Sequence, residues 1–391
     1  MKISLKNLSQ TLLGIYIISI YLFAGTVTTL RLSHLAFIAF AIVSLIYVIS
    51  NKIKISNILL LLSGFVLYSA ISLFWASSSG AGFGMVLTLA QLLLLSFLAY
   101  NIADENLIRK IPYFFAYAGI LMFIYSMIVY TPNGIIQSVI SGKRIGDKIA
   151  QINDFGMQAA MGSIACIFIA IYYEKRRYLL FVPFIVILVF ASGSKKALII
   201  LALGTIITYL LKYGLSFRFL VFMSGLFIIG ILALQLPYFS SISKRFSVMI
   251  QTFLGNDSVD GSTSERMNMI SIGLRLFSGK PIFGYGPANY AINAAPFLGR
   301  PVYSHNNFIE LLVNGGVFGF LLFYFSYFIF FIKSISLKKF TFIFIYLFIM
   351  ILLDIGQVSY YSKILFIMMG LAGYHSIDKF AELRPNNVQN V

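Results

Sequence analysis

A short polar motif, Tyr303-Ser304-His305-Asn306-Asn307, stands directly before an apolar stretch that begins at Phe308. Ser304 or Asn306 can cap the helix that this stretch predicts, which puts His305 beside a helix N-terminus. The partial positive charge there favours the neutral imidazole. A neutral imidazole can accept a proton from a hydroxyl group, so His305 is a candidate general base. A surface or hydrogen-bonding role for His305 is the alternative.

Arg266 is the second candidate, because it lies near the start of a predicted amphipathic helix at about 263–278. Ser262-Thr-Ser-Glu265 has the form of a capping box. Apolar residues then follow at helical spacing: Met267, Ile270, Leu274 and Phe277. Arg266 falls on the side that carries part of this apolar face, where a guanidinium needs an anion, and its fork suits phosphate. An ion pair with Asp257 or Asp260, or contact with a lipid headgroup, is the alternative.

Two further basic segments could bind an anion. Ser192-Gly-Ser194-Lys195-Lys196 joins two apolar stretches, and Ser194 can cap the second helix beside the two lysines. A helix N-terminus with adjacent cations is an anion site. The loop 131–155 carries Lys143, Arg144 and Lys148. Basic side chains that reach along the membrane surface to lipid headgroups are the alternative for both segments.

The elements that must position these residues are membrane-spanning helices. Sixty per cent of the 391 residues are hydrophobic and 10% are charged, which a soluble chain could not bury. The apolar residues come in blocks long enough to cross about 30 Å of hydrocarbon as helix. We therefore expect an all-α polytopic bundle of about 12 transmembrane helices. The expected spans are 9–27, 33–50, 57–75, 84–101, 111–130, 156–173, 178–193, 196–211, 218–236, 308–332, 340–354 and 362–377.

The placement of charge predicts the topology. If the chain starts inside the cell, every cytoplasmic segment is basic, for example Lys175-Arg176-Arg177, and both termini are cytoplasmic. We interpret 1–391 as one polytopic domain, with an outward loop subdomain at 237–307. The candidate residues then lie on the outer face, in three segments whose basic residues are exceptions to the rule that Lys and Arg gather in cytoplasmic loops. The net charge of +17 follows membrane-helix ends, so nucleic acid is not expected as a partner.

The three motifs together resemble the family of O-antigen ligases and oligosaccharide repeat-unit polymerases. Ser194-Lys195 stands where the family commonly has Ser-Arg-Gly. Arg266, followed by Gly284-Tyr-Gly286 and Tyr290, matches its outward-loop arginine and glycine stretch. His305-Asn306 and a downstream set match its His-Asn and glycine pattern, namely Glu310, Gly315, Gly316 and Gly319. The resemblance covers about 190–320.

The resemblance implies a GT-C-like membrane glycosyltransferase that is metal-independent, needs no cofactor and uses a polyprenyl-diphosphate-linked oligosaccharide as donor. His305 would deprotonate the acceptor hydroxyl, and Arg266 would hold the diphosphate leaving group. Lys195 would supply a second cation, as a point charge in place of a bidentate arginine. Arg144, which precedes Asn153, is a third candidate clamp. Two neighbours of His305, Asn306 and Tyr303, are assigned to the diphosphate or the sugar.

Three functions remain to be separated. We expect a polymerase of lipid-linked repeat units for O-antigen, capsule or exopolysaccharide, in the bacterial cytoplasmic membrane. The alternative within the family is a ligase that transfers a finished glycan to lipid A core or another acceptor. The alternative from another class is a flippase for the lipid-linked oligosaccharide, which would need ionisable residues along a central cavity. The expected partners are membrane lipids, with a flippase or a chain-length regulator as candidate protein partners.

Overall fold

A computed structural model of the chain describes residues 4–24, 27–225 and 261–376, with the side chains of 27–30 and 261–263 left out. All regular structure in these residues is helical, which confirms the all-α prediction. The helices are α1 (Leu5–Leu22), α2 (Val27–Ile49), α3 (Asn57–Ile71), η1 (Ser72–Trp75), α4 (Ser79–Asn101), α5 (Glu105–Tyr130), α6 (Pro132–Ser141), α7 (Ile152–Tyr172), η2 (Arg176–Phe181), α8 (Val182–Ser192), α9 (Lys195–Tyr213), α12 (Gly261–Gly279), α13 (Tyr290–Leu298), α14 (Asn307–Ser336), α15 (Phe342–Leu353) and α16 (Lys363–His375).

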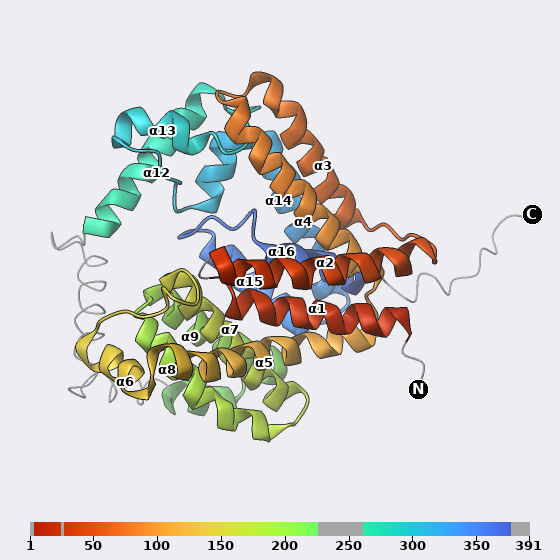
Figure 1. Cartoon of the computed structure of the whole chain (residues 1–391), viewed down its shortest axis with the longest axis vertical. Helices are drawn as coiled ribbons and strands as arrows, with labels where there is room; N and C mark the ends of the chain where they lie inside the picture. The colour runs from red at the N-terminus through yellow and green to blue at the C-terminus, as the bar shows by residue number, and fades with distance from the viewer. Residues whose placement is uncertain (1–3, 25–26, 226–260, 377–391) are drawn as a thin grey trace, which may run out of the picture.

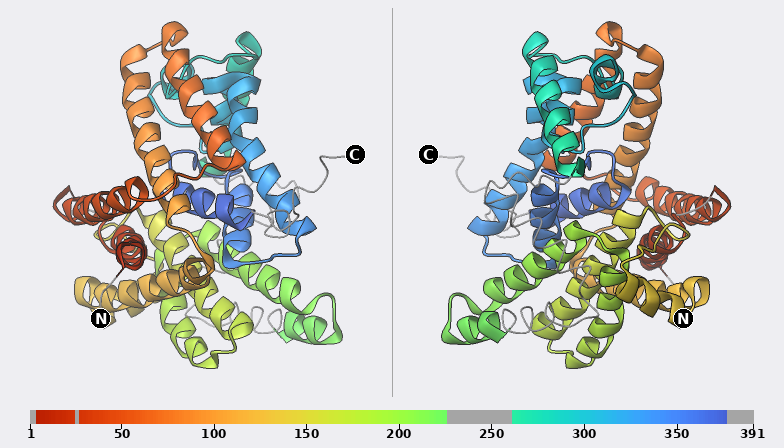
Figure 2. Two further views of the ribbon diagram at one scale, coloured as in Figure 1. Left: turned by 90° about the vertical axis from the view of Figure 1, so that its right-hand side faces the viewer. Right: turned by 90° about the vertical axis from the view of Figure 1, so that its left-hand side faces the viewer.

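The helices form two groups with a hairpin between them (Figure 1). α3, α4, α12, α13 and α14 lie in one group, and α5 to α9 lie in the other. Figure 2 shows α15 and α16, in dark blue, between the two groups. α7 is the most enclosed long helix, with 72% of its membrane window buried, and it packs against α5, α8 and α9. The core therefore sits around α7, beside the hairpin.

Seven helical segments in the described part of the chain are long and apolar enough to cross a membrane. They are α2, α4, α5, α7, α9, α14 and the continuous segment of α3 and η1. The chain is thus a multi-pass membrane protein. The expected span 178–193 is instead η2 followed by α8, which has 11 residues. Most of the expected span 218–236 lies outside the described residues. The expected count of about 12 is therefore not reached by long helices in the described part of the chain.

The expected spans 340–354 and 362–377 also need correction. α15 has 12 residues and α16 has 13, so each is about 20 Å long and too short to cross the hydrocarbon alone. The polar residues between them, among them Asp354 and Ser359, form a non-helical connection. Such backbone is tolerated at membrane depth where it is buried in protein or lines a cavity.

Glycines in α14 allow two close approaches. Gly315 and Gly319 face Tyr68 of α3 and let the two helices approach closely. The Tyr68 hydroxyl lies 2.8 and 2.9 Å from the carbonyl oxygens of Phe283 and Gly315. Gly316 kinks α14 with φ 61°, a conformation that glycine adopts at low cost. The kink places the start of α14 against the turn at residues 281–286.

Replacing Gly316 with alanine should lower the thermal unfolding midpoint in detergent. The new Cβ would meet the carbonyl oxygen of Ile282, and the positive φ alone costs about 1–3 kcal/mol. Gly84→Ala is the matched control, since its Cβ would enter open space on helix α4. Alanine there should leave the midpoint unchanged or raise it slightly. Equal midpoints for the two variants would contradict the strained kink.

Candidate active site

The loop that carries His305 is held in a fixed conformation by buried hydrogen bonds. The Ser304 backbone N–H donates to Glu310 Oε2 at 2.8 Å, and the Ser304 hydroxyl donates to the Asn306 carbonyl at 2.6 Å. The Asn306 side chain accepts from the Ile309 N–H at 3.0 Å and so caps α14, as predicted. His305 itself has φ 54°, in the left-handed region. A non-glycine residue keeps this conformation only when its surroundings determine it.

Asn307 ties this loop to the α15–α16 connection. Its amide donates to Asp354 Oδ2 at 3.2 Å, and its carbonyl oxygen accepts from the Ser359 and Tyr360 N–H groups at 2.9 and 3.1 Å. Asp354 also accepts from the Ser359 hydroxyl and from the Tyr324 hydroxyl, at 2.5 and 2.7 Å. A buried network of this kind rigidifies the parts that it joins. The His305 loop and the hairpin connection are therefore one unit.

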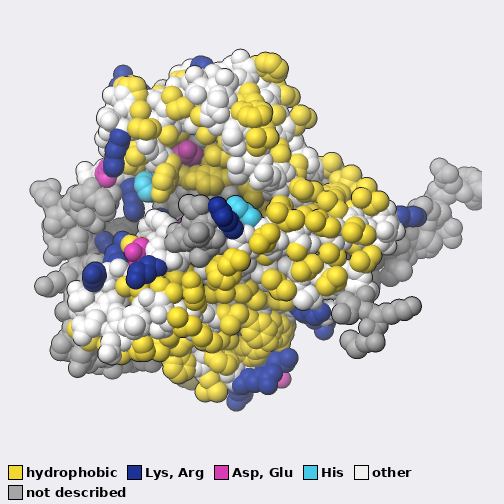
Figure 3. Space-filling model, viewed as in Figure 1, with side chains coloured by type: hydrophobic (Ala, Val, Ile, Leu, Met, Phe, Trp, Pro, Cys, Tyr) yellow, Lys and Arg dark blue, Asp and Glu magenta, His cyan; other side chains and the backbone are white. Residues whose placement is uncertain are grey.

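A cavity of about 460 Å³ opens beside His305. Figure 3 shows this face hollowed between α12 and the group of α7 and α9, with Lys, Arg, His and acidic side chains around the hollow. Part of the lining is polar or charged: Gln151, Asn153, Asp154, Gln158, Lys196, Tyr303, His305, Gln357, Ser359, Tyr361, Ser362 and Lys363. The rest is largely apolar: Ile20, Tyr21, Ala24, Met157, Met161, Ile200, Tyr346, Met350, Leu353, Val358 and Ile364. The cavity can thus accept a ligand with a polar head and an apolar tail.

The imidazole of His305 is neutral at physiological pH. Burial lowers its pKa, and the positive charges of Arg266 and Lys196 lower it further, to about 4, against a small opposing effect of Glu265. The ring of Tyr303 lies against it, with centroids 4.1 Å apart. Burial raises the pKa of Tyr303, so its hydroxyl stays protonated. The predicted neutral state therefore holds, with burial and two cations as its causes.

Arg266 comes from α12, which packs on α13 and α14. No described residue forms a hydrogen bond or ion pair with the Arg266 guanidinium, which is half-buried. The proposed partners Asp257 and Asp260 lie outside the described residues, as do the side chains of Ser262 and Thr263 in the predicted capping box. Arg266 is not among the cavity-lining residues, but its charge acts on His305 and Lys196, which are. A half-buried guanidinium near these two residues could bind an anion there.

The predicted apolar residues of α12 are not all buried within the protein. Met267 and Leu274 are 64% and 50% exposed, whereas Met269 is 2% exposed. Gly273 lies directly against Ile309 of α14, since a Cβ on this glycine would meet that side chain. The close approach at Gly273 sets the rotation of the helix, and apolar spacing alone could not show it. The predicted helix itself is confirmed, over Gly261–Gly279.

Lysine 196, and not Lys195, lines the cavity. Ser194 caps α9 as predicted, with its hydroxyl accepting from the Ala197 N–H at 3.4 Å. Lys195 is the first residue of α9, and adjacent residues on a helix point about 100° apart. The Lys196 ammonium donates to the carbonyl oxygen of Gly356 in the α15–α16 connection. Lys196 is thus held at the cavity wall, and the role predicted for Lys195 remains a prediction.

Arg144 stabilises two segments next to the cavity without lining it. Its Nε donates to the Ser192 carbonyl at 2.8 Å, and its Nη2 donates to Asn153 Oδ1 at 2.7 Å. Arg144 therefore joins the end of α8 to the start of α7, and it is not among the cavity-lining residues. The Asn306 side chain is likewise hydrogen-bonded within the protein, because its amide also donates to the Ile355 carbonyl at 3.1 Å. Tyr303, by contrast, lines the cavity and is 42% exposed.

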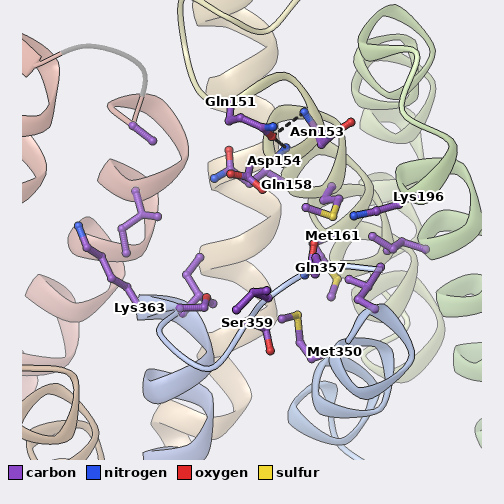
Figure 4. A pocket seen from close by; sticks show the side chains of 18 of the residues that line it. Gln151, Asn153, Asp154, Gln158, Met161, Lys196, Met350, Gln357, Ser359 and Lys363 are labelled. Atoms are coloured by element: carbon purple, nitrogen blue, oxygen red, sulfur yellow. Dashed lines mark hydrogen bonds between the residues drawn. The ribbon is translucent and has the colours of Figure 1, made fainter. Parts of the chain in front are cut away.

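Sequence reasoning missed the polar wall that α7 contributes. Asn153, Asp154 and Gln158 line the cavity from the first two turns of α7, together with its N-cap Gln151 (Figure 4). The Gln151 side chain accepts from the Asn153 and Asp154 N–H groups at 3.0 and 3.3 Å. Polar residues at one end of an otherwise apolar span were the available signal. Within the described residues, no group of three or more His, Cys, Asp or Glu side chains could hold a metal ion.

Comparison with known families gives an independent result. Residues 179–324 match the family model described as O-antigen ligase. The match includes α8, α9, α12, α13 and the first part of α14, and therefore Lys196, Arg266 and His305. Comparisons with curated proteins and with solved structures found no match. On this match, the segment 179–324 is similar to the O-antigen ligase family.

Proposed function

We propose that this protein is a polymerase of lipid-linked oligosaccharide repeat units, acting on the outer face of the bacterial cytoplasmic membrane. One observation carries the proposal: a neutral His305 and Lys196 line a cavity that also has an apolar part, and Arg266 is near enough for its charge to lower the His305 pKa. A base, two cations and an apolar compartment match the acceptor hydroxyl, the diphosphate and the polyprenyl chain of such a reaction. The seven long apolar helices and the basic segments between spans support the membrane placement, with both termini cytoplasmic.

In the proposed reaction, the oxygen of an acceptor sugar hydroxyl attacks the anomeric carbon of the donor glycan. The bond from that carbon to the phosphate oxygen breaks, and polyprenyl diphosphate leaves with the bonding electrons. His305 takes the proton of the attacking hydroxyl. Arg266 and Lys196 stabilise the negative charge that develops on the diphosphate. The side chains of the α7 wall, Asn153, Asp154 and Gln158, can hydrogen-bond sugar hydroxyls. No metal ion or cofactor is required for these steps.

The family match is common to polymerases and ligases, so the acceptor decides between them. A ligase would transfer the finished glycan to lipid A core or another acceptor. A flippase would carry the ligand across the membrane without breaking a bond. The cavity-lining lysines and Asp154 lie in the first turns of helices and not along the middle of spans. A continuous polar path for a flippase is not formed by these side chains.

Reconstitution with one substrate separates these functions. The protein is placed in vesicles with a synthetic polyprenyl-diphosphate repeat unit and no other acceptor, and the products are separated on a gel. A polymerase gives a ladder spaced by one repeat unit. Product that forms only after lipid A core is added would establish a ligase. Transport of intact substrate with no new glycosidic bond would establish a flippase and contradict the proposal.

The pH dependence of the transfer should show an acid limb. The proposed base must be unprotonated, so kcat/KM should fall as pH falls through the His305 pKa of about 4. Bound diphosphate offsets the charges of Arg266 and Lys196, which raises the His305 pKa in the complex. The acid limb of kcat should therefore lie at higher pH than that of kcat/KM. Initial rates from pH 3.5 to 8 measure both limbs, and coincident limbs would contradict this coupling.

A further inference from the structure

The cavity has a second cationic side chain at another part of its wall. Lys363, the first residue of α16, lines the same cavity as Lys196. In Figure 4 the two lysines come from opposite sides, with Ser359, Gln357 and Met350 between them. Lys363 and Lys196 are therefore on separate parts of the cavity wall.

No described residue compensates the charge of Lys363. Its side chain is half-buried, and it forms no hydrogen bond or ion pair with the part of the chain that the structure describes. It also occupies the N-terminal turn of α16, where the helix dipole disfavours a cation. Ionisable residues inside a membrane bundle normally face a partner or a ligand path. The position of Lys363 is thus unfavourable in the empty protein and favourable with an anion bound.

The backbone around Lys363 is suited to the same anion. α16 begins after the non-helical connection 354–362, which lies between two helices too short to span the membrane. The N-terminal ends of interrupted helices in membrane proteins point at anionic groups of ligands. The N-cap Ser362 also lines the cavity. A helix end, a hydroxyl and an uncompensated ammonium therefore meet at one part of the cavity wall.

We propose that Lys363 binds the diphosphate of the acceptor, a second lipid-linked repeat unit, while Arg266 and Lys196 bind that of the donor. This inference rests on the proposed polymerase function and specifies its second substrate. A polymerase must hold two lipid-linked substrates at once, and each carries a diphosphate. Lys363 would bind one of these diphosphates, and Lys196 with Arg266 would bind the other.

Two acceptors that differ only in the phosphate test the assignment. One is the polyprenyl-diphosphate repeat unit, and the other is the same glycan on a neutral lipid aglycone. Lys363→Gln should raise KM for the diphosphate acceptor about 10- to 100-fold, the effect of losing a hydrogen bond to a charged group. KM for the neutral acceptor and kcat for both should not change. Lys363→Arg should stay near wild type, as should Lys54→Gln, an exposed control outside the cavity.

Several results would overturn the inference. Equal losses with both acceptors would make Lys363 structural, and a raised donor KM would make it a donor contact. An unchanged KM for the diphosphate acceptor would show that Lys363 does not bind the acceptor diphosphate. This result is expected if Lys363 contacts a phospholipid headgroup. Titration with glycan-free polyprenyl diphosphate gives a readout that does not need turnover. Wild type should bind two equivalents and Lys363→Gln one. Two equivalents without any transfer would contradict the proposed function alone, and one equivalent in wild type would contradict this inference.

Discussion

Replacing His305 with alanine should lower kcat about 10²–10⁴-fold, the usual contribution of a general base. Donor binding should change little, because Arg266 and Lys196 remain to hold the diphosphate. The reason for the large effect is the geometry: the neutral imidazole lines the cavity in a loop that Ser304 and Glu310 hold in place. Initial rates with saturating donor and acceptor measure kcat, and titration with polyprenyl diphosphate measures binding.

His34→Ala is the control for this prediction. His34 is exposed on α2 and does not line the cavity, so its removal should leave kcat unchanged. His305→Gln keeps a polar side chain of similar size but cannot act as a base, and it should be as slow as the alanine variant. Wild-type rates in either His305 variant would remove His305 from the chemistry and would leave the family match of residues 179–324 unaffected.

Replacing Arg266 with alanine should lower kcat by about 10²–10³-fold, because one preorganised cation at the leaving group is lost. Arg266→Lys should recover part of the rate, since a lysine restores the charge but not the bidentate fork. Loss of the charge also removes one of the influences that lower the His305 pKa. The acid limb of kcat/KM in Arg266→Ala should therefore move to higher pH.

Arg275→Gln is the matched control on the same helix. Arg275 is exposed on α12 and stacks over Phe297, 5.1 Å from the ring centroid, away from the residues that line the cavity. Its loss should change neither kcat nor the acid limb. If Arg266→Ala lowers kcat without moving the acid limb, the two residues are not electrostatically coupled, and the shared site is contradicted.

Local signals in the sequence predicted the parts of the site that depend on neighbours in the chain. Asn306 caps α14 and Ser194 caps α9, because each cap is determined by a few adjacent residues. The helix of α12 was predicted for the same reason. These signals were sufficient to select His305 and Arg266 as candidates.

The sequence could not show features that depend on packing between distant segments. Apolar spacing placed Met267, Ile270, Leu274 and Phe277 together on α12, but it could not show that the helix packs on α14 through Gly273, which lies against Ile309. The lysine that reaches the cavity is Lys196, because the rotation of α9 is set by its packing on α7 and α15. Hydropathy also predicted full membrane spans at 340–354 and 362–377. The structure has the short helices α15 and α16 there, and Asp354 and Ser359 between them form a buried network with Asn307.

A single-turnover experiment tests the central claim most directly. Excess protein is mixed with a donor labelled separately in its glycan and its polyprenyl diphosphate, together with the neutral acceptor. We predict that free polyprenyl diphosphate and acceptor-linked glycan form at the same rate and in equal amounts, and that His305→Ala slows both. Release of polyprenyl diphosphate with free reducing glycan, or no bond cleavage at all in a wild type that binds the donor, would contradict a glycosyl transfer at this site.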